Sequence, residues 1–224
     1  MPTITDDSVS AASPECTRAA ARRTQILDAA AECFRSCGFH GASIARISQL
    51  AGMSGGHIYH YFDSKEAIIA AIVQRDLEHL IAIWAELRAA RDVGEAMVRL
   101  SSEGVGDAMN PVIARLRLEI LTEAARNPEV AHILRAADRC CMASLIETLL
   151  AARRAGGKQD DETTLAAMAE IVASMFEGLM IRAVRNPDLN SKRMSILVQR
   201  VMRQVIDSPD WRAMPTESDA AGTD

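Results

Sequence analysis

The sequence predicts an all-α fold of about nine helices, and three observations carry this prediction. Apolar residues recur at three- and four-residue intervals through almost every long segment between residues 18 and 207, which is the period of an amphipathic helix. Runs that alternate apolar and polar residues over the length of a strand are essentially missing. Residues that typically start or stop helices stand at the ends of the periodic segments.

The first ninety residues contain two long helical segments. One runs from Arg22 to Gly38, where glycine can adopt the left-handed conformation that follows a helix end. The other opens at a capping box formed by Asp63 and Glu66 and continues to about residue 90.

Two short helices are predicted between these long ones. Ser43 can cap the first, which ends at Gly52, and Ser54 can cap the second, which contains Ile58. Two short amphipathic helices joined by a tight turn form a helix-turn-helix, and the second helix of this motif can lie in the major groove of DNA.

Five more helices follow along the chain. Asp92 and Glu95 form a second capping box, but Gly104 and Gly106 should make the helix after it short or irregular. Two Asn-Pro pairs and two polar residues start the others, which we expect over residues 111–126, over residues 128–155, from Asp161 and from about Ser191.

Composition divides the chain into four parts. Residues 1–17 and 208–224 lack periodicity and are predicted to be disordered tails, whereas residues 18–66 hold the helix-turn-helix and residues 67–207 hold the remaining helices. The net charge is −5, but the tails carry the acidic excess, and residues 18–66 have six basic against four acidic side chains. With so small a positive charge, a monomer would bind DNA phosphates weakly. DNA binding would therefore need a dimer and uncharged hydrogen-bond donors.

Four motifs stand in register across residues 22–73: the turn GFHGASI, the turn AGMS, the helix end YHYF and the helix start SKEA. This run resembles the DNA-binding domain of TetR-family transcriptional regulators. Beyond residue 90, the helix layout, the Asn-Pro starts and the FEGL at residues 176–179 resemble the AcrR- or BetI-like branch. The resemblance implies a three-helix DNA-binding domain followed by a helical ligand-binding and dimerisation domain. It also implies a homodimeric repressor that a small-molecule effector releases from a palindromic operator.

The resemblance assigns roles to residues of the helix-turn-helix. Phosphate contacts are implied for Ser43, Tyr59, His60 and Lys65, and base contacts for Arg46, Gly55, Gly56 and His57. The family often has a side chain at the position of Gly55, so its absence here puts more weight on His57 and Arg46. Tyr59 could instead belong to the core of a small domain, and Tyr61 and Phe62 are expected there. The full set of expected DNA-binding residues is Arg23, Ser43, Arg46, Ser54, Gly55, Gly56, His57, Tyr59, His60 and Lys65.

The middle and last helices are expected to hold two further sites. Ligand pockets are mostly apolar with a few polar groups, which suggests a pocket lined by Trp84, Met97, Met109, Arg117 and Cys140. The alternative is that polar residues of the middle helices, such as Arg117, lie on solvated helix faces or in ion pairs, as most such residues do. The last two helices carry broad apolar stripes that suit a two-fold interface, as the resemblance also implies. The expected interface residues are Leu165, Met168, Val172, Met175, Phe176, Leu179, Leu197, Val201 and Val205.

Other classes of function remain as alternatives at this point. A small-molecule-binding helical protein with a degenerate DNA-binding head is suggested by Gly55, Gly56 and the small positive charge. An enzyme lacks support, because no phosphate loop, nucleophile elbow or HExxH motif is present, so no catalytic residue is expected. His57 and His60 lack a third ligand nearby, so we expect no metal and no cofactor.

The remaining features concern the compartment of the cell. No apolar run reaches 18 residues and the amino end carries acids, so we expect a cytoplasmic protein without a membrane partner. The five cysteines match no disulfide framework or zinc pattern and are interpreted as reduced, mainly buried thiols. Redox-sensitive pairs at Cys33 and Cys37 or at Cys140 and Cys141 are the alternative.

Overall fold

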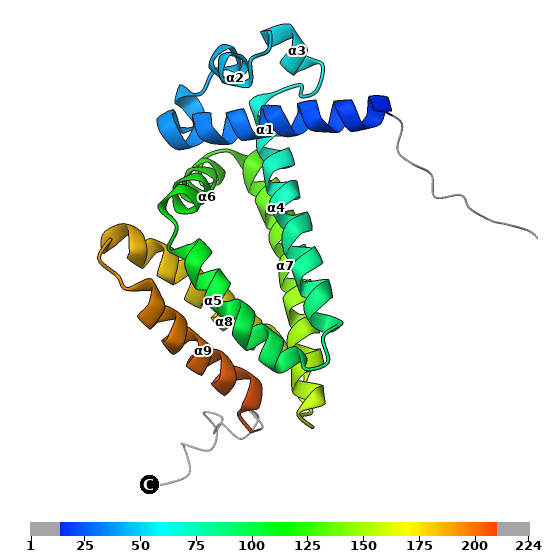
Figure 1. Ribbon diagram of the computed structural model, residues 1–224, viewed down its shortest axis with the longest axis vertical. Helices are drawn as coiled ribbons and strands as arrows, with labels where there is room; N and C mark the ends of the chain where they lie inside the picture. Colours follow the sequence, from blue (N-terminus) through cyan, green and yellow to red (C-terminus); the bar gives the residue numbers. More distant parts are fainter. Residues whose placement is uncertain (1–13, 210–224) are drawn as a thin grey trace, which may run out of the picture. The chain divides into compact units, whose positions relative to one another are not determined.

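The computed structural model describes residues 14–209, and this part of the chain contains nine α-helices and no strand (Figure 1). The predicted all-α fold is therefore confirmed. Most of the two predicted tails, residues 1–13 and 210–224, lies outside the described residues. The helices are α1 (Pro14–Gly41), α2 (Ile44–Ala51), α3 (Gly55–Tyr59), α4 (Lys65–Arg88), α5 (Val93–Ala108), α6 (Pro111–Ala124), α7 (Pro128–Ala155), α8 (Glu162–Arg185) and α9 (Ser191–Asp207).

Side-chain caps start the helices of the second half. Asp92, Asn110, Asn127 and Asp161 accept backbone N–H groups of α5, α6, α7 and α8 at 2.7–3.1 Å, as the sequence predicted. Asn190 caps α9 in the same way. Each cap stabilises its helix by about 1 kcal/mol, which explains why these boundaries could be placed from local sequence.

Three predicted boundaries in the first half are wrong. Helix α1 already begins at Pro14, so residues 14–17 are helical rather than part of a tail. Gly38 has the predicted positive φ of 72°, but the chain resumes a helical turn after this kink and continues to Gly41. The cap of α4 is Ser64, whose Oγ accepts the N–H of Ala67 at 3.0 Å, and not Asp63.

The chain divides into two compact units, and the division falls between Ile68 and Ile69 within α4. In the first unit, α1 packs against α2, and α2 packs against α3. Gln25 of α1 donates to the carbonyl oxygen of Ala51 at 2.7 Å, which ties α1 to the end of α2. The fully buried residues of this unit are Ile26, Ala30, Cys33, Ala42, Ile47, Ile58 and Ile68.

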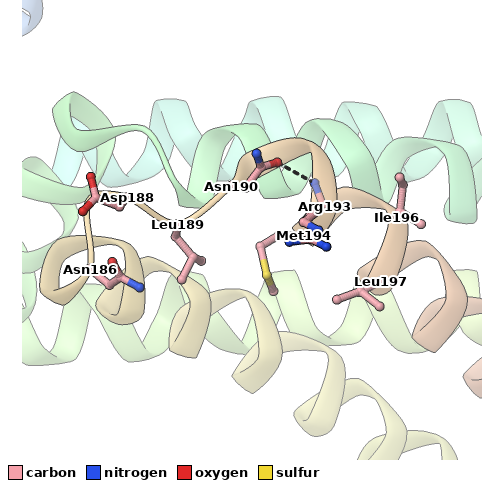
Figure 2. Close-up of a pocket in the computed structure, with 8 residues that line it drawn as sticks. All are labelled: Asn186, Asp188, Leu189, Asn190, Arg193, Met194, Ile196 and Leu197. Carbon is pink, nitrogen blue, oxygen red and sulfur yellow. Dashed lines mark hydrogen bonds between the residues drawn. The ribbon is translucent and has the colours of Figure 1, made fainter.

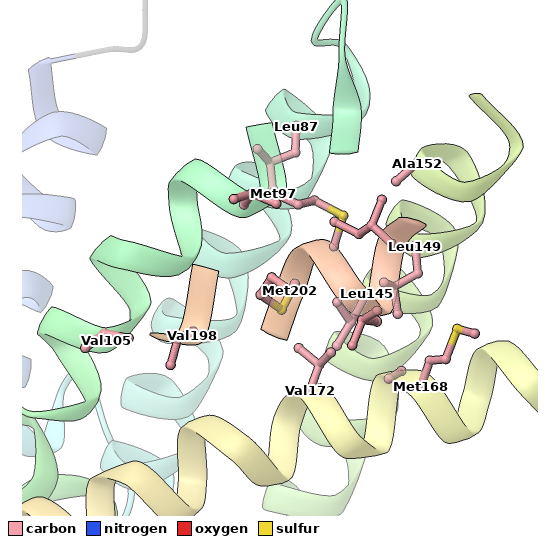
Figure 3. Close-up of a cluster of buried hydrophobic side chains, with 14 of the residues drawn as sticks. Leu87, Met97, Val105, Leu145, Leu149, Ala152, Met168, Val172, Val198 and Met202 are labelled. Atoms are coloured by element: carbon pink, nitrogen blue, oxygen red, sulfur yellow. The ribbon is translucent and has the colours of Figure 1, made fainter. Parts of the chain in front are cut away.

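The second unit is built around α5, which packs along α9 and also contacts α7 and α8 (Figure 1). Its core draws buried side chains from all six helices α4 to α9, and Figure 3 shows part of it. The residues labelled there are Leu87, Met97, Val105, Leu145, Leu149, Ala152, Met168, Val172, Val198 and Met202.

Two arginines tie the ends of helices into this second unit. Arg153 of α7 is 1% exposed, pairs with the buried Asp160 and donates to the carbonyl oxygens of Val205 and Ile206 at 2.8 and 3.0 Å. Its guanidinium therefore satisfies carbonyls at the end of α9 that have no partner within the helix. Arg88, the last residue of α4, donates to the hydroxyls of Ser144 and Thr148 on α7.

Helix α5 is continuous over 16 residues, so the expectation that glycines would shorten it is wrong. Gly104 is instead a position of close helix packing. A Cβ atom at Gly104 would lie 2.9 Å from Cε1 of Phe176 on α8, whereas a Cβ at Gly106 would meet no described atom within 4 Å. The absence of a side chain at Gly104 makes room for the aromatic ring.

Replacing Gly104 by alanine is expected to lower the free energy of unfolding by about 1 kcal/mol. Overpacking against Phe176 costs about 1–3 kcal/mol, and the better helix propensity of alanine recovers up to about 1 kcal/mol of this. Gly106→Ala is the matched control and should raise stability by about 0.5–1 kcal/mol, because only the propensity changes. Urea denaturation of the two variants measures both effects, and a Gly104→Ala variant as stable as Gly106→Ala would contradict the packing argument.

Candidate nucleic-acid interface

Two serine hydroxyls fix the backbone of the helix-turn-helix. The Oγ of Ser43 accepts the N–H of Arg46 at 3.2 Å, and the Oγ of Ser54 accepts the N–H of His57 at the same distance. Gly52 ends α2 in the left-handed conformation with φ 63°. Each capping hydroxyl still has its own proton to donate, so both serines can cap a helix and bind a phosphate oxygen together.

The second helix of the motif, α3, is shorter than predicted and has five residues. Ile58 is its buried residue, while His57, Tyr59 and His60 are exposed. Tyr59 is 56% exposed, so the alternative that places it in the core is wrong. Phe62 is buried as expected. The buried Ile58 side chain therefore anchors this short helix, while the helix and its C-cap present three polar rings to solvent.

The rings at the end of α3 contact one another. The ring centroid of Tyr61, a partly buried residue, lies 5.4 Å from that of His57 and 5.3 Å from that of His60, both edge to face. The two histidine rings are stacked with centroids 6.5 Å apart. These contacts restrict the rotamers of both histidines, so their ring nitrogens are presented in a limited set of directions.

The first two residues of α3, Gly55 and Gly56, have no side chains, so the backbone is uncovered there. A Cβ at either position would meet no atom of the described chain within 4 Å, and neither glycine has a positive φ. Neither packing nor backbone conformation therefore requires glycine here. The backbone itself can approach a flat or charged surface closely at this point.

The three basic residues of the predicted interface differ in their surroundings. Arg46 is exposed on α2. The guanidinium of Arg23 lies over the Phe62 ring, 4.5 Å from its centroid. Lys65 is partly buried, and its Nζ donates to the carbonyl oxygen of Phe39 at 2.8 Å and lies over the Phe39 ring. Lys65 therefore holds the turn after Gly38, with two N–H groups left for other acceptors.

The residues predicted to line a ligand pocket differ in how deeply they are buried. Met97 is a core residue and is 2% exposed, and Arg117 and Cys140 are exposed. Trp84 and Met109 are partly buried against the core. The neighbour of Cys140, Cys141, is partly buried and lies near Trp84.

A groove of about 700 Å³ lies elsewhere, where α8 leads into α9 (Figure 2). None of the predicted pocket residues lines it. Its lining consists of Asn186, Asp188, Leu189, Asn190, Arg193, Met194, Ile196 and Leu197. Of these, only Leu197 belongs to a predicted site, the dimer interface.

The residues predicted for the dimer interface differ in their exposure. Five of the nine are buried inside their own chain, namely Leu165, Met168, Val172, Leu179 and Val205. Met175 and Phe176 are partly buried against the same core. Leu197 and Val201 are exposed. The sequence analysis missed further exposed apolar residues on these helices, which are Ile171, Ile181, Val184 and Ile196.

Helix α8 therefore has apolar residues on two sides. One side packs on α5 and α7, and the other carries Ile171 and Ile181 at the surface. By length and a mean hydropathy of 1.5 it also passes the composition test for a membrane span, alone among the described helices. The core helix of a globular domain passes the same test. The buried residues on the packed side of α8 match such a core helix.

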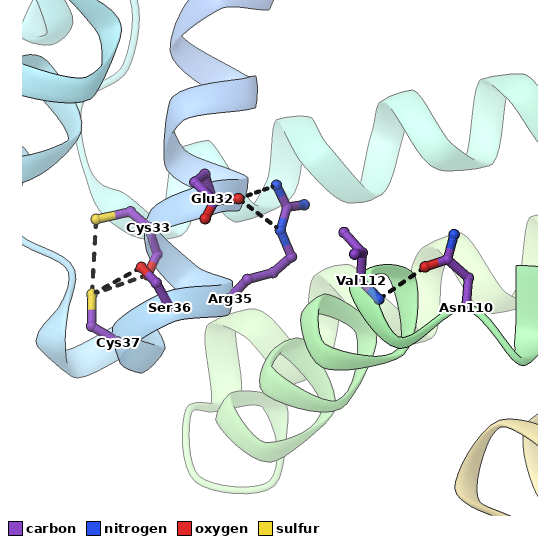
Figure 4. Close-up of polar contacts among 7 residues, drawn as sticks. All are labelled: Glu32, Cys33, Arg35, Ser36, Cys37, Asn110 and Val112. Atoms are coloured by element: carbon purple, nitrogen blue, oxygen red, sulfur yellow. Dashed lines mark hydrogen bonds and ion pairs between the residues drawn. The ribbon is translucent and has the colours of Figure 1, made fainter. Parts of the chain in front are cut away.

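Two thiols of α1 lie close together (Figure 4). The Sγ atoms of Cys33 and Cys37 are 3.9 Å apart, and the Cys37 thiol donates to the carbonyl oxygen of Cys33 at 3.0 Å. Burial, together with Cys37, raises the pKa of Cys33. A raised pKa keeps this thiol protonated and unreactive at neutral pH. The expectation of buried thiols is met at Cys33 and is wrong for Cys140, which is exposed.

Comparison with known families gives matches in both halves of the chain. The family described as bacterial regulatory proteins, tetR family, matches residues 26–72. The family described as BetI-type transcriptional repressor, C-terminal, matches residues 90–207.

Individual proteins with curated names are also similar. The HTH-type transcriptional regulator UidR of Escherichia coli K12 is 38% identical over 123 residues, which cover 53% of this chain and 60% of UidR. The repressor Rv1474c of Mycobacterium tuberculosis is 44% identical over 64 residues, or 29% of this chain and 34% of the repressor. The match thus spans about 60% of the length of UidR and about a third of Rv1474c.

Solved structures match over most of the chain. Salmonella enterica GusR has a TM-score of 0.70 and 25% identity, and the match covers 83% of this chain and 95% of GusR. Bacillus subtilis FadR, solved in complex with stearoyl-CoA, has a TM-score of 0.69 and 18% identity, with 84% and 99% coverage. At that identity the FadR match supports the fold alone.

Proposed function

Because the chain belongs to the TetR family of bacterial transcriptional regulators, we propose that it is a cytoplasmic, homodimeric repressor that a small-molecule effector releases from a palindromic operator. The observation that carries this proposal is the surface of α3. A short helix is capped by Ser54 and anchored by buried Ile58, and it holds His57, Tyr59 and His60 in solvent. Exposed aromatic and imidazole side chains on the second helix of a helix-turn-helix are placed to enter a major groove.

Phosphate binding depends mainly on uncharged donors in this proposal. The hydroxyls of Ser43, Ser54 and Tyr59 and the ring N–H of His60 can each donate to a phosphate oxygen. The bare backbone at Gly55 and Gly56 lets α3 approach the DNA closely. Contacts of this kind release few counterions, so binding should depend less on salt than in strongly basic DNA-binding proteins.

Base recognition is assigned to two side chains. Arg46 is exposed on α2 and His57 is exposed on α3, and both can reach base edges. Dimerisation doubles these contacts and places two α3 helices about 34 Å apart or somewhat more, in successive major grooves. The exposed apolar residues of α8 and α9 are the proposed dimer surface.

Effector control follows from a two-state equilibrium. A ligand in the second unit releases DNA only if it binds the DNA-free state more tightly, and operator DNA must then weaken ligand binding by the same factor. The FadR structure with stearoyl-CoA supports the idea that this fold can hold a ligand with a long acyl chain.

A gel-shift titration with the DNA upstream of the protein's own gene tests the proposal. The wild-type dimer should bind this fragment more tightly than random DNA. Arg46→Ala and His57→Ala should each weaken operator binding by about 5- to 150-fold and reduce the preference for the operator, because a base contact contributes about 1–3 kcal/mol. Tyr59→Phe is the matched variant that should weaken binding equally on both DNAs.

The opposite result favours the alternative function. A wild-type protein that binds no fragment better than random DNA, while it remains dimeric, would identify a ligand-binding protein whose DNA-binding head has degenerated. The missing side chains at Gly55 and Gly56 are the feature that would explain such a loss.

A further inference from the structure

Two thiols lie one turn apart on α1, and the proposed DNA contacts use neither of them. The Sγ atoms of Cys33 and Cys37 are 3.9 Å apart (Figure 4). The Cys37 thiol donates its one proton to the carbonyl oxygen of Cys33 at 3.0 Å. The Cys33 thiol is therefore the donor to the Cys37 sulfur, and this contact holds the two sulfurs next to each other.

Helix geometry places the pair within the range of a disulfide. Cα atoms four positions apart in an α-helix are separated by about 6.2 Å, and disulfides join Cα atoms separated by about 4.4–6.8 Å. Cβ atoms at this spacing are about 5–6 Å apart, whereas a disulfide needs about 3.5–4.5 Å. A bond between the sulfurs therefore draws the two Cβ atoms together by about 1–2 Å, and the backbone of the helix must move.

The backbone on the carboxyl side of Cys37 can take up this movement. Gly38 interrupts α1 with φ 72° and ψ 169°, so Cys37 is the last residue before the kink, whereas Cys33 lies one turn inside the helix. The turn beyond the kink packs on Cys37, because a Cβ atom at Gly41 would lie 3.2 Å from the Cβ of Cys37. This turn is therefore expected to move together with Cys37.

The two thiols differ in their access to solvent. Cys33 is fully buried, whereas Cys37 is partly exposed. Burial, together with Cys37, raises the pKa of Cys33, so its thiol stays protonated at neutral pH. A dissolved oxidant therefore meets Cys37 first. Redox-sensing proteins often place a second thiol beside an accessible one, because the second thiol converts the first oxidation product into a disulfide.

We propose that Cys37 and Cys33 form a disulfide when the protein meets a hydroperoxide. The Cys37 sulfur attacks one oxygen of the hydroperoxide, the O–O bond breaks, and the second oxygen leaves with the thiol proton as water or an alcohol. The Cys33 sulfur then attacks the sulfur of the Cys37 sulfenic acid. The S–O bond breaks, and the hydroxyl group leaves with the Cys33 proton as water. One hydroperoxide thus takes two electrons from the pair.

The disulfide acts on the DNA-binding surface through Lys65. The Nζ of Lys65 donates to the carbonyl oxygen of Phe39 at 2.8 Å and lies 4.3 Å from the centroid of the Phe39 ring. Phe39 belongs to the turn after Gly38, so a movement of Cys37 displaces the anchor of Lys65, a predicted DNA-binding residue. Oxidation should therefore weaken operator binding. This effect rests on the proposed function, whereas formation of the disulfide does not.

Trypsin provides a direct test, because Arg35 lies between the two cysteines. Cleavage at the arginines gives the peptides 24–35 and 36–46, each with one thiol. We would treat the reduced full-length protein with hydrogen peroxide, block the remaining thiols with iodoacetamide in urea, digest it and record peptide masses with and without dithiothreitol. The two peptides should form one linked species that dithiothreitol separates. Separate peptides, with Cys37 either unmodified or carrying added oxygen, would overturn the proposal.

Two variants assign the roles of the thiols. Cys33→Ala removes the second thiol, so the reaction should stop at a Cys37 sulfenic acid, which dimedone traps. Cys140→Ser removes an exposed thiol of α7 and is the matched control, which should form the disulfide as the wild type does. A disulfide that joins Cys37 to another cysteine, or a Cys33→Ala variant that dimedone does not label at Cys37, would overturn these roles. The wild-type peptide masses decide the pairing even where Cys33→Ala loosens the core.

A gel shift separates the disulfide from its effect on DNA. Oxidation should weaken operator binding by about tenfold or more, the order of one hydrogen bond to a charged group, and dithiothreitol should restore it. Cys37→Ser should bind DNA equally with and without peroxide. A disulfide that forms without changing operator binding would overturn the link through Lys65. A reduced protein that binds no DNA would overturn the proposed function, while the peptide masses would still establish the disulfide.

Discussion

Replacing Arg153 by methionine is expected to lower the free energy of unfolding by about 3–5 kcal/mol, the range for breaking a buried ion pair from one side. Arg153 is 1% exposed and its partner Asp160 is buried with it. The substitution leaves the Asp160 carboxylate buried without its cation. It also removes the donors that satisfy the carbonyl oxygens of Val205 and Ile206 at the end of α9.

Chemical denaturation at neutral pH measures this loss. Arg203→Met is the matched control, because Arg203 pairs with Glu95 at 2.8 Å but both side chains are about half exposed. Exposed pairs contribute about 0–1 kcal/mol, so this variant should stay close to wild type. Adding Asp160→Asn to Arg153→Met should recover part of the loss, since no unpaired charge then remains buried. A loss below about 1 kcal/mol for Arg153→Met would mean that water reaches the pair.

Placing aspartate at Leu197 and Val201 together is expected to convert the proposed dimer into monomers and to weaken the proposed operator binding on the order of 100-fold. Both side chains are about half exposed on α9, and a charge there would be buried at the proposed interface. Loss of the partner removes half of the DNA contacts, and residues 18–66 have only six basic side chains to compensate.

Sedimentation velocity and the gel shift measure the two effects separately. The control is Leu121→Asp, which puts the same charge on an apolar residue of α6 that is 46% exposed. This control should remain dimeric. A dimer that survives the double substitution would place the interface elsewhere, for example around the groove where α8 leads into α9.

Local interactions explain what the sequence could predict. The caps at Asp92, Asn110, Asn127 and Asp161 involve residues two or three positions apart, so each is visible in a short stretch of sequence. The helix-turn-helix was predicted for the same reason, since its turn and both caps lie within about twenty residues.

Several of the errors arise where a distant partner decides the outcome. The local sequence around Gly104 predicts a broken helix. The reason for the glycine is the Phe176 ring, 72 positions away, which leaves no room for a Cβ atom. The interface prediction selected the most regular apolar positions of α8 and α9, and α5 and α7 cover most of them. Cys140 and Cys141 differ by one position, about 100° around the helix, which separates a solvent-facing thiol from one near Trp84.

The hydrogen bonds of Arg88 have a mechanical consequence for α4. They fasten the last residue of this helix to the hydroxyls of Ser144 and Thr148 on α7. The last turn of a helix usually frays, because its carbonyl groups have no partner within the helix. The last turn of α4 is instead held by a neighbouring helix, so we expect it to open only together with α7 and not on its own.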